Sequence, residues 1–155
     1  MPTARTSSPR SGRRVPRARI LPAVGIPDEE ILETLHRGYE AYNRRDYDAV
    51  SALMHPEVIF VRPGAEPDLR GVEAFRTWME PDAFESQASE PREIEIRDQK
   101  VLVHQRTKAR GAGSGIEMEI DSWAVWTFDD DRLITRLETY LDHEEAEARR
   151  AFEGG

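Results

Sequence analysis

His104 and Asp121 are the two side chains in this sequence best suited to acid–base chemistry. Each lies in a segment whose composition predicts a β-strand, and a turn between the strands can be placed so that the two residues face each other. A carboxylate beside an imidazole raises the pKa of the imidazole and orients it, which would make His104 a general base. The pair falls on the face expected to be the outer one. That position favours the alternative, a structural pair at a dimer interface.

Arg62 is a candidate anion anchor. It follows Val58 and Phe60 at two-residue steps in a predicted strand, so it is expected to point to the concave side of a sheet. A guanidinium there would hold a carboxylate, phosphate or enolate. The alternative is that Arg62 leans to the rim and pairs with Glu66 or Asp68 in the next loop.

A third set of residues could line a small-molecule pocket on the concave face. Aromatic rings would shape a flat pocket, and neutral polar groups would supply hydrogen bonds without acid–base chemistry. Plain core packing is the alternative for the aromatic members. With Arg62, the expected pocket residues are Tyr39, Tyr42, Phe60, Trp78, Gln105, Ser122, Trp126, Leu137 and Thr139.

Neither a metal nor a cofactor is expected. The four histidines show no ligand spacing, and the chain has no cysteine. The glycine-rich run Gly111–Gly115 joins two predicted strands rather than a strand and a helix, so it is not expected to bind phosphate.

The first half of the chain is expected to be mainly helical. Apolar residues recur at three- and four-residue steps after an acidic first turn, which predicts an amphipathic helix. Asp46 is expected to cap the next helix, and His55-Pro56 to end it. The expected elements are a helix from Pro27 to about Asn43, a short helix from Asp46 to Met54, a strand over Val58–Val61, a loop over Pro63–Gly71 and a helix over Val72–Met79.

The second half is expected to form an antiparallel meander, because the breaks between its strands are too short for crossovers. With the helices covering one face of this sheet, the fold class is α+β. The expected elements are an irregular stretch over Pro81–Pro91, strands over Arg92–Asp98, Lys100–Arg110, Ile116–Phe128 and Arg132–Asp142, and a helix over Glu144–Phe152.

Charge complementarity across the strands predicts the register. A turn centred between Ala112 and Gly113 pairs opposite charges: Lys108 with Glu117, Arg106 with Glu119, and His104 with Asp121. A turn centred on Asp130-Asp131 pairs Ala124 with Leu137, and Ser122 with Thr139. The face that carries Leu137 is interpreted as concave.

Length and charge limit the possible functions. The 155 residues suffice for one domain. Residues 1–25 carry six arginines and no acid, which leaves a net charge of −14 on the remainder. Nucleic-acid binding by that acidic part is not expected. The basic tail is expected to be disordered. Alternatively, it contacts nucleic acid or acidic lipid, or translation starts later, near Val15 or Val24.

Location follows from what the sequence lacks. No apolar run reaches the length of a membrane span, and no apolar segment follows the arginines as in a signal peptide. The absence of cysteine fits a reducing compartment. A cytoplasmic protein that binds no membrane is expected.

Three stretches resemble the SnoaL-like branch of the NTF2-like superfamily: YEAYNRRDYDAVSALMHPEVIF, DLRGVEAFRTW and GSGIEMEIDSWAVWTFDDDRLITRLETYLDHEEA. The resemblance covers roughly Ile31 to Phe152. It implies a domain over residues 26–152, with a curved antiparallel sheet wrapped around a long N-terminal helix and shorter helices. It also implies a pocket at the open end and a homodimer through the outer sheet face. Members include polyketide cyclases, ketosteroid isomerases and proteins without chemistry.

The steroid isomerase mechanism is not expected. The positions that resemble the catalytic tyrosine, aspartate base and protonated acid of that family are Gly38, Arg62 and Ala124. The expected function is therefore to bind a small hydrophobic metabolite, neutral or anionic, and in one version to transform it. A cyclase or isomerase with a His104–Asp121 base and a non-catalytic dimerisation module are the alternatives.

Overall fold

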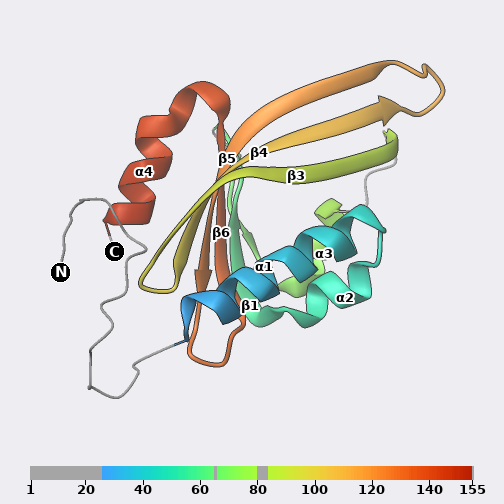
Figure 1. Ribbon diagram of the computed structural model, residues 1–155. Helices are drawn as coiled ribbons and strands as arrows, with labels where there is room; N and C mark the ends of the chain where they lie inside the picture. Colours follow the sequence, from blue (N-terminus) through green and yellow to red (C-terminus); the bar gives the residue numbers. More distant parts are fainter. Residues whose placement is uncertain (1–25, 65, 80–83, 155) are drawn as a thin grey trace, which may run out of the picture.

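The computed structural model describes residues 26–64, 66–79 and 84–154. The expected basic tail, residues 1–25, lies outside them. Three helices cover one face of a curved six-stranded sheet, and a fourth covers part of the other (Figure 1). The elements are α1 (Asp28–Asn43), α2 (Tyr47–Ala52), β1 (Met54–Val61), β2 (Leu69–Arg70), α3 (Val72–Met79), β3 (Phe84–Arg97), β4 (Lys100–Gly111), β5 (Glu117–Phe128), β6 (Ile134–Leu141), the 3₁₀ turn η1 (Asp142–Glu144) and α4 (Glu145–Glu153).

The strands lie in the order β2-β1-β6-β5-β4-β3. Consecutive pairs from β3 to β6 are antiparallel, as expected from their short connections. The pairing of β1 with β6 is parallel, and β1 is joined to β6 only through all the intervening elements. The paired ends of β3, β4 and β5 extend beyond the helices as an arm (Figure 1).

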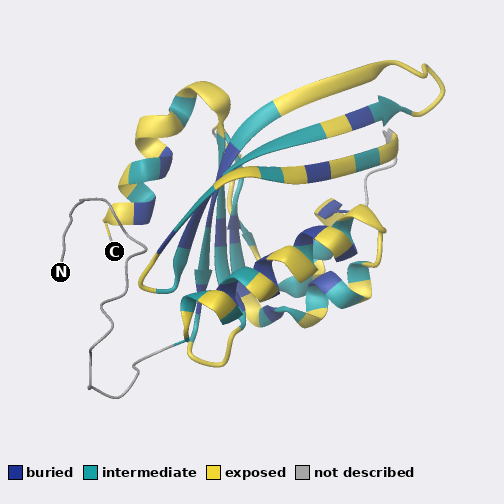
Figure 2. Cartoon of the chain, viewed as in Figure 1, coloured by how far each residue is buried: buried dark blue, intermediate teal, exposed yellow. Residues whose placement is uncertain are grey.

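The main core lies between the concave face of the sheet and α1–α3. The apolar stripe of α1 supplies Ile31, Leu35 and Tyr39, and the sheet supplies side chains such as Phe60 and Val103. Figure 2 shows the buried positions of α1 on the side that faces the sheet, with exposed positions opposite. This alternation is the amphipathic pattern that the sequence predicts.

A second core lies on the outer face, where α4 packs on β4, β5 and β6. Ala148 and Phe152 are one turn apart on α4, so they present one apolar face to Leu102, Trp123 and Val125. Helices on only one face had been expected, so this part of the expectation is wrong. The local pattern of α4 shows an apolar face without showing which side of the sheet receives it.

Several predicted boundaries also differ. Met54 begins β1 instead of ending α2, and the expected loop contains the two-residue strand β2. Strand β3 begins at Phe84, although residues 81–91 were expected to be irregular. Pro91 had suggested a break, but it lies at a bulge in an edge strand, where a missing N–H costs little pairing.

Both predicted hairpin registers are displaced by two residues. Arg106 lies opposite Asp121, and His104 lies opposite Trp123. The hairpin loop is longer than a two-residue turn: the N–H of Gly111 bonds to the carbonyl of Ile116, and Gly113 has φ +83°. A two-residue displacement keeps each side chain on its face, so the predicted faces are correct. In the second hairpin, Ala124 faces Thr139 and Ser122 faces Leu141.

Asn43, the last residue of α1, holds the edge strand β3. Its amide nitrogen donates to the Ser89 carbonyl at 2.9 Å, and its amide oxygen accepts from the Ser89 N–H at 2.8 Å. The side chain thus takes the hydrogen bonds that another strand would otherwise take at this edge.

Replacing Asn43 by alanine is expected to lower the free energy of unfolding by about 1–3 kcal/mol, because two backbone groups of buried Ser89 lose their partners. Urea unfolding measures the loss. Arg44→Ala is the matched control, since the neighbouring side chain is exposed and makes one long ion pair, 3.7 Å from Asp46. Equal losses in the two variants would contradict a stabilising role for the hydrogen bonds between Asn43 and Ser89.

Among the described residues, no helix has the length and apolar character needed to cross a membrane.

Candidate functional site

A polar cluster lies on the concave face between α1 and the sheet. The hydroxyl of Tyr39, on α1, donates a short hydrogen bond to Oε1 of Gln105. Nε2 of Gln105 donates to Oγ of Ser122 at 3.2 Å. Gln105 and Ser122 are cross-strand partners on β4 and β5, so the sheet register brings them together.

Trp126 completes this concave cluster, defined here as Tyr39, Gln105, Ser122 and Trp126. Its ring meets that of Tyr39 edge to face, with centroids 5.8 Å apart. Its indole N–H is buried and interacts weakly with the Tyr39 hydroxyl, which lowers the pKa of Tyr39 against the larger effect of burial. The Trp126 donor is therefore directed into the cluster.

The cluster carries no charge near neutral pH. Burial raises the pKa of Tyr39, and the neighbouring Trp126 only partly opposes this rise. The other members are an amide, a hydroxyl and an indole. Because the Ser122 oxygen accepts from Gln105, its own proton remains available for donation. This chemistry suits the binding of a neutral polar group rather than proton transfer near pH 7.

Exposed apolar side chains continue the concave face beyond the cluster. Ile120 lies two residues before Ser122 on the same face and is 50% exposed, and Leu141 lies directly opposite Ser122 and is 42% exposed. Met118 extends the same row along β5 toward the tip of the arm, and exposed Ile116 lies in the loop just before the strand. We call Ile116, Met118, Ile120 and Leu141 the apolar strip.

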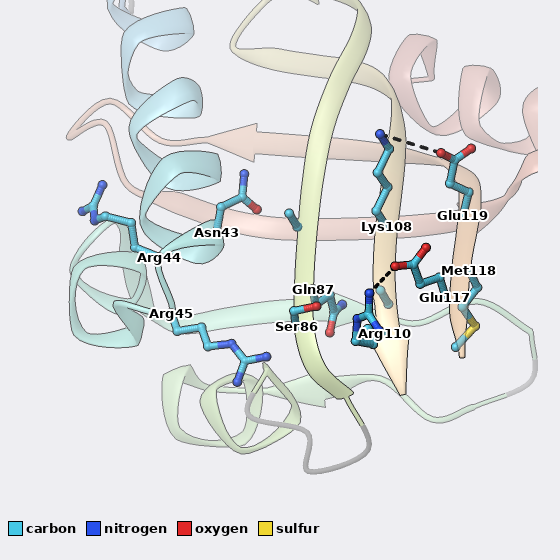
Figure 3. Close-up of a pocket in the computed structure, with 12 residues that line it drawn as sticks. Asn43, Arg44, Arg45, Ser86, Gln87, Lys108, Arg110, Glu117, Met118 and Glu119 are labelled. Carbon is cyan, nitrogen blue, oxygen red and sulfur yellow. Dashed lines mark hydrogen bonds and ion pairs between the residues drawn. The ribbon is translucent and has the colours of Figure 1, made fainter. Parts of the chain in front are cut away.

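A hollow of about 700 Å³ lies between the end of α1 and the arm. Figure 3 shows side chains from α1 and its following turn on one side, and from β3, β4 and β5 on the other. Met118 of the apolar strip lines it, with basic residues whose partners are acidic: Lys108 lies 3.7 Å from Glu119. Its lining residues are Asn43, Arg44, Arg45, Ser86, Gln87, Ala88, Lys108, Ala109, Arg110, Glu117, Met118 and Glu119.

None of the predicted pocket residues lines this hollow. It depends on β3 running from Phe84 beside β4, a stretch that the sequence had indicated as irregular. The sequence from Phe84 to Glu90 shows no alternation of apolar and polar residues, so it carried no signal that could have revealed this strand.

The remaining predicted pocket residues sit mainly in packing positions. Phe60 is buried with its ring 4.6 Å from that of Trp78, which is itself 43% exposed. Leu137 is buried in the main core. The Thr139 hydroxyl donates to the Val61 carbonyl at 3.1 Å, and Tyr42 packs edge to face on Tyr47. Their role in lining a pocket stays a prediction.

Arg62 is held by the loop that follows it. Its Nε and Nη2 donate to the carbonyl of Pro67 at 3.2 and 2.8 Å, and Nη1 lies 3.4 Å from a Glu66 carboxylate oxygen. This is the alternative foreseen from the sequence, with Glu66 rather than Asp68 as the partner. The guanidinium charge is thus already balanced.

His104 and Asp121 lie on the outer face, and each has a different partner from the one expected. His104 Nε2 lies 2.8 Å from Oδ1 of Asp142, and its ring stacks on Trp123 with centroids 4.2 Å apart. Arg106 donates to both oxygens of Asp121, at 2.9 and 3.2 Å, and these bonds lower the pKa of that carboxyl. The expected cross-strand pairing is wrong because of the two-residue register displacement.

The buried tyrosines predict a loss of stability in alkali. Burial raises the pKa of Tyr42 to about 12, so the folded state keeps a proton that the unfolded chain releases near pH 10. The contribution of Tyr42 to the free energy of unfolding is complete below pH 10. It is lost as the pH rises toward 12, at up to about 1.4 kcal/mol per pH unit. Urea unfolding between pH 8 and 11 measures the slope. Tyr42→Phe should flatten it, and an unchanged slope would contradict this assignment.

A model of the SnoaL-like domain family matches residues 35–137, about two thirds of the chain. A comparison with curated proteins finds no match.

Solved structures share the fold at low sequence identity. TerC, co-crystallised with polyporic acid, superposes with a TM-score of 0.63 at 22% identity, over 76% of this chain and 95% of TerC. The epoxide hydrolase/cyclase-like enzyme SalBIII, described in pyran ring formation of salinomycin, superposes with a TM-score of 0.67 at 15% identity, over 76% of this chain and 94% of SalBIII. A Mycobacterium tuberculosis protein in complex with estradiol-17β-hemisuccinate superposes with a TM-score of 0.64 at 15% identity, over 74% of this chain and 95% of that protein.

Proposed function

Because the chain belongs to the SnoaL-like domain family, we propose that it binds a small, largely apolar and uncharged molecule on the concave face of its sheet. Two proteins of the same fold were crystallised with small molecules, polyporic acid and estradiol-17β-hemisuccinate. Fold alone does not assign a ligand. The proposal therefore rests on the side chains of this chain.

The observation that carries it is the juxtaposition of the apolar strip and the concave cluster. Ile120 and Leu141 are exposed on the same face as Ser122, with Leu141 as the cross-strand partner of Ser122. A contiguous exposed apolar surface with a few polar groups at one end is typical of a binding site for a small molecule. The ligand would cover the strip and place one hydrogen-bonding group at Ser122.

Charge favours a neutral ligand over an anion. The concave cluster has no cationic member, and Arg62 is already bonded to Glu66 and Pro67. An anion placed at Ser122 would lose its hydration without gaining a countercharge. This narrows the expectation from the sequence, in which Arg62 anchored an anionic group.

Binding without catalysis is favoured by the groups that the site offers. The cluster supplies hydroxyl, amide and indole groups, and Tyr39 stays protonated near neutral pH. His104 and Asp121 occupy the opposite face of the sheet, so they cannot reach a molecule bound at Ser122. A His104–Asp121 base is therefore not part of the proposal.

The test is a calorimetric and thermal-shift screen of rigid apolar compounds that carry one hydroxyl or ketone, each beside its carboxylate analogue. At 100 times its Kd, a ligand should stabilise the protein by about 2.7 kcal/mol. Ile120→Lys should abolish binding, because it places a charge in the apolar strip. Glu119→Gln is the matched control on the opposite face and should retain binding. Equal binding by both variants, or preference for the carboxylates, would reject the proposal.

The arm offers an uncovered part of the outer face for self-association. Helix α4 covers Leu102, Trp123 and Val125, while Arg106 and Lys108 remain outside that cover. We propose this uncovered part of the outer face as the dimer surface. The oligomeric state of the wild type and of Lys108→Glu, measured by sedimentation, tests the proposal. A monomer at 100 μM in both would contradict it.

A further inference from the structure

An imidazole and two carboxylates from three separate chain segments meet on the outer face. His104 comes from β4, Asp121 from β5 and Asp142 from the turn that leads into α4. One ligand atom from each lies within 4.8 Å of the others. The group is separate from the concave cluster, because the sheet lies between them.

Neighbouring groups hold the side chains of His104 and Asp121 and the backbone at Asp142. The His104 ring stacks on Trp123, and the Trp123 indole N–H donates to the Asp142 carbonyl at 3.1 Å. The backbone of the turn at Asp142 is further held where the Leu141 N–H donates to a Glu144 carboxylate oxygen at 2.8 Å. Arg106 holds the Asp121 carboxylate by donating to both of its oxygens. Such supporting hydrogen bonds are typical of metal ligands.

We propose that His104, Asp121 and Asp142 bind one divalent transition-metal ion of the zinc class. One imidazole nitrogen and carboxylate oxygens form a donor set that zinc accepts, with water in the remaining position. Tetrahedral bonds of about 2.0–2.2 Å place ligand atoms about 3.3–3.6 Å apart. His104 Nε2 and Asp142 Oδ1 are already 2.8 Å apart, and Asp142 is exposed and can adjust. The ion would displace the proton in the hydrogen bond between His104 Nε2 and Asp142 Oδ1.

A simple ion pair is the competing explanation. His104 and Asp142 could interact with no third group, and Arg106 could satisfy Asp121 completely. Removal of either His104 or Asp142 would then change stability by the same amount with or without metal. The metal site instead requires all three residues and makes the stability of the protein depend on the ion.

The ion would tie α4 to the sheet. Its ligands lie on two adjacent strands and on the turn before α4, so binding cross-links the helix entry to the face that α4 covers. This role is structural, and it is independent of the ligand proposed for the concave face.

The experiment titrates the full chain with zinc chloride by calorimetry, with magnesium chloride as the comparison. Wild type should bind one zinc, and its melting temperature should rise by about 5 °C or more at 100 times the Kd. His104→Gln and Asp142→Asn should each weaken binding at least tenfold. His143→Gln and Asp130→Asn are matched controls in the adjacent residue and in an exposed turn, and both should bind as wild type does.

Three results would overturn the proposal: no zinc binding at 100 μM, equal zinc affinity in His104→Gln and His143→Gln, or magnesium binding as tight as zinc. Circular dichroism checks the fold of each variant. If His104→Gln does not fold, Asp142→Asn decides the question, because that side chain is 61% exposed and its loss should not unfold the domain.

Discussion

Replacing Trp123 by alanine is expected to lower the free energy of unfolding by about 3–5 kcal/mol, the range for a buried aromatic residue. Trp123 is 5% exposed and belongs to the core that α4 closes with Ala148 and Phe152. The substitution also removes the stack on His104 and the indole hydrogen bond to Asp142. Because these contacts join α4 to the sheet, the loss should include the docking of α4.

Trp78→Ala is the matched control for this prediction. Trp78 is 43% exposed, so the same deletion should cost clearly less, about 1–2 kcal/mol. Urea unfolding gives both values, and protease cleavage within α4 reports its release. Equal losses, or a Trp123→Ala variant whose α4 stays protected, would show that the outer core does not hold the helix.

Replacing Gln105 by leucine is expected to lower the free energy of unfolding by about 1–3 kcal/mol. The change leaves the buried hydroxyl of Tyr39 without its acceptor. In a variant that also carries Tyr39→Phe, no hydroxyl is left unpaired, so most of the loss should be recovered. The two substitutions should therefore be coupled by about 1–3 kcal/mol in a double-mutant cycle.

This double-mutant cycle includes its own control, because the effect of each single substitution is compared with its effect in the variant that carries both. Additivity within about 0.5 kcal/mol would mean that Tyr39 and Gln105 do not interact. The folded double variant also serves the ligand screen. It should keep the apolar strip but lose part of the polar end of the site, and so bind the same compound more weakly.

Local patterns in the sequence were sufficient for several elements. The apolar spacing and the bounds Val72–Met79 predicted α3 as observed. Asp46 caps α2 as expected, since its carboxylate accepts from the Ala49 N–H at 3.1 Å. Alternation along β4 and β5 assigned Gln105 and Ser122 to the concave face correctly. Each of these features depends on side chains within a few residues of one another.

The register between neighbouring strands was harder to predict from the sequence. The charge pattern suited two registers, because shifting by two residues still places basic residues opposite acidic ones, and Lys108 meets Glu119 instead of Glu117. The choice between them depends on the length of the loop and on the glycine conformations within it. Charge pairs at the surface contribute too little energy to decide it.

The sequence by itself therefore determined where the helices and the strands β4, β5 and β6 lie to within a few residues, and which face of the sheet their side chains occupy. Only the tertiary structure decided which partners they meet. It joined His104 to Asp142 rather than Asp121, placed α4 on the outer face, and brought Tyr39 to Gln105 across 66 positions of sequence. The reason is that periodicity is a local property, whereas a contact between distant residues depends on how all the intervening elements pack.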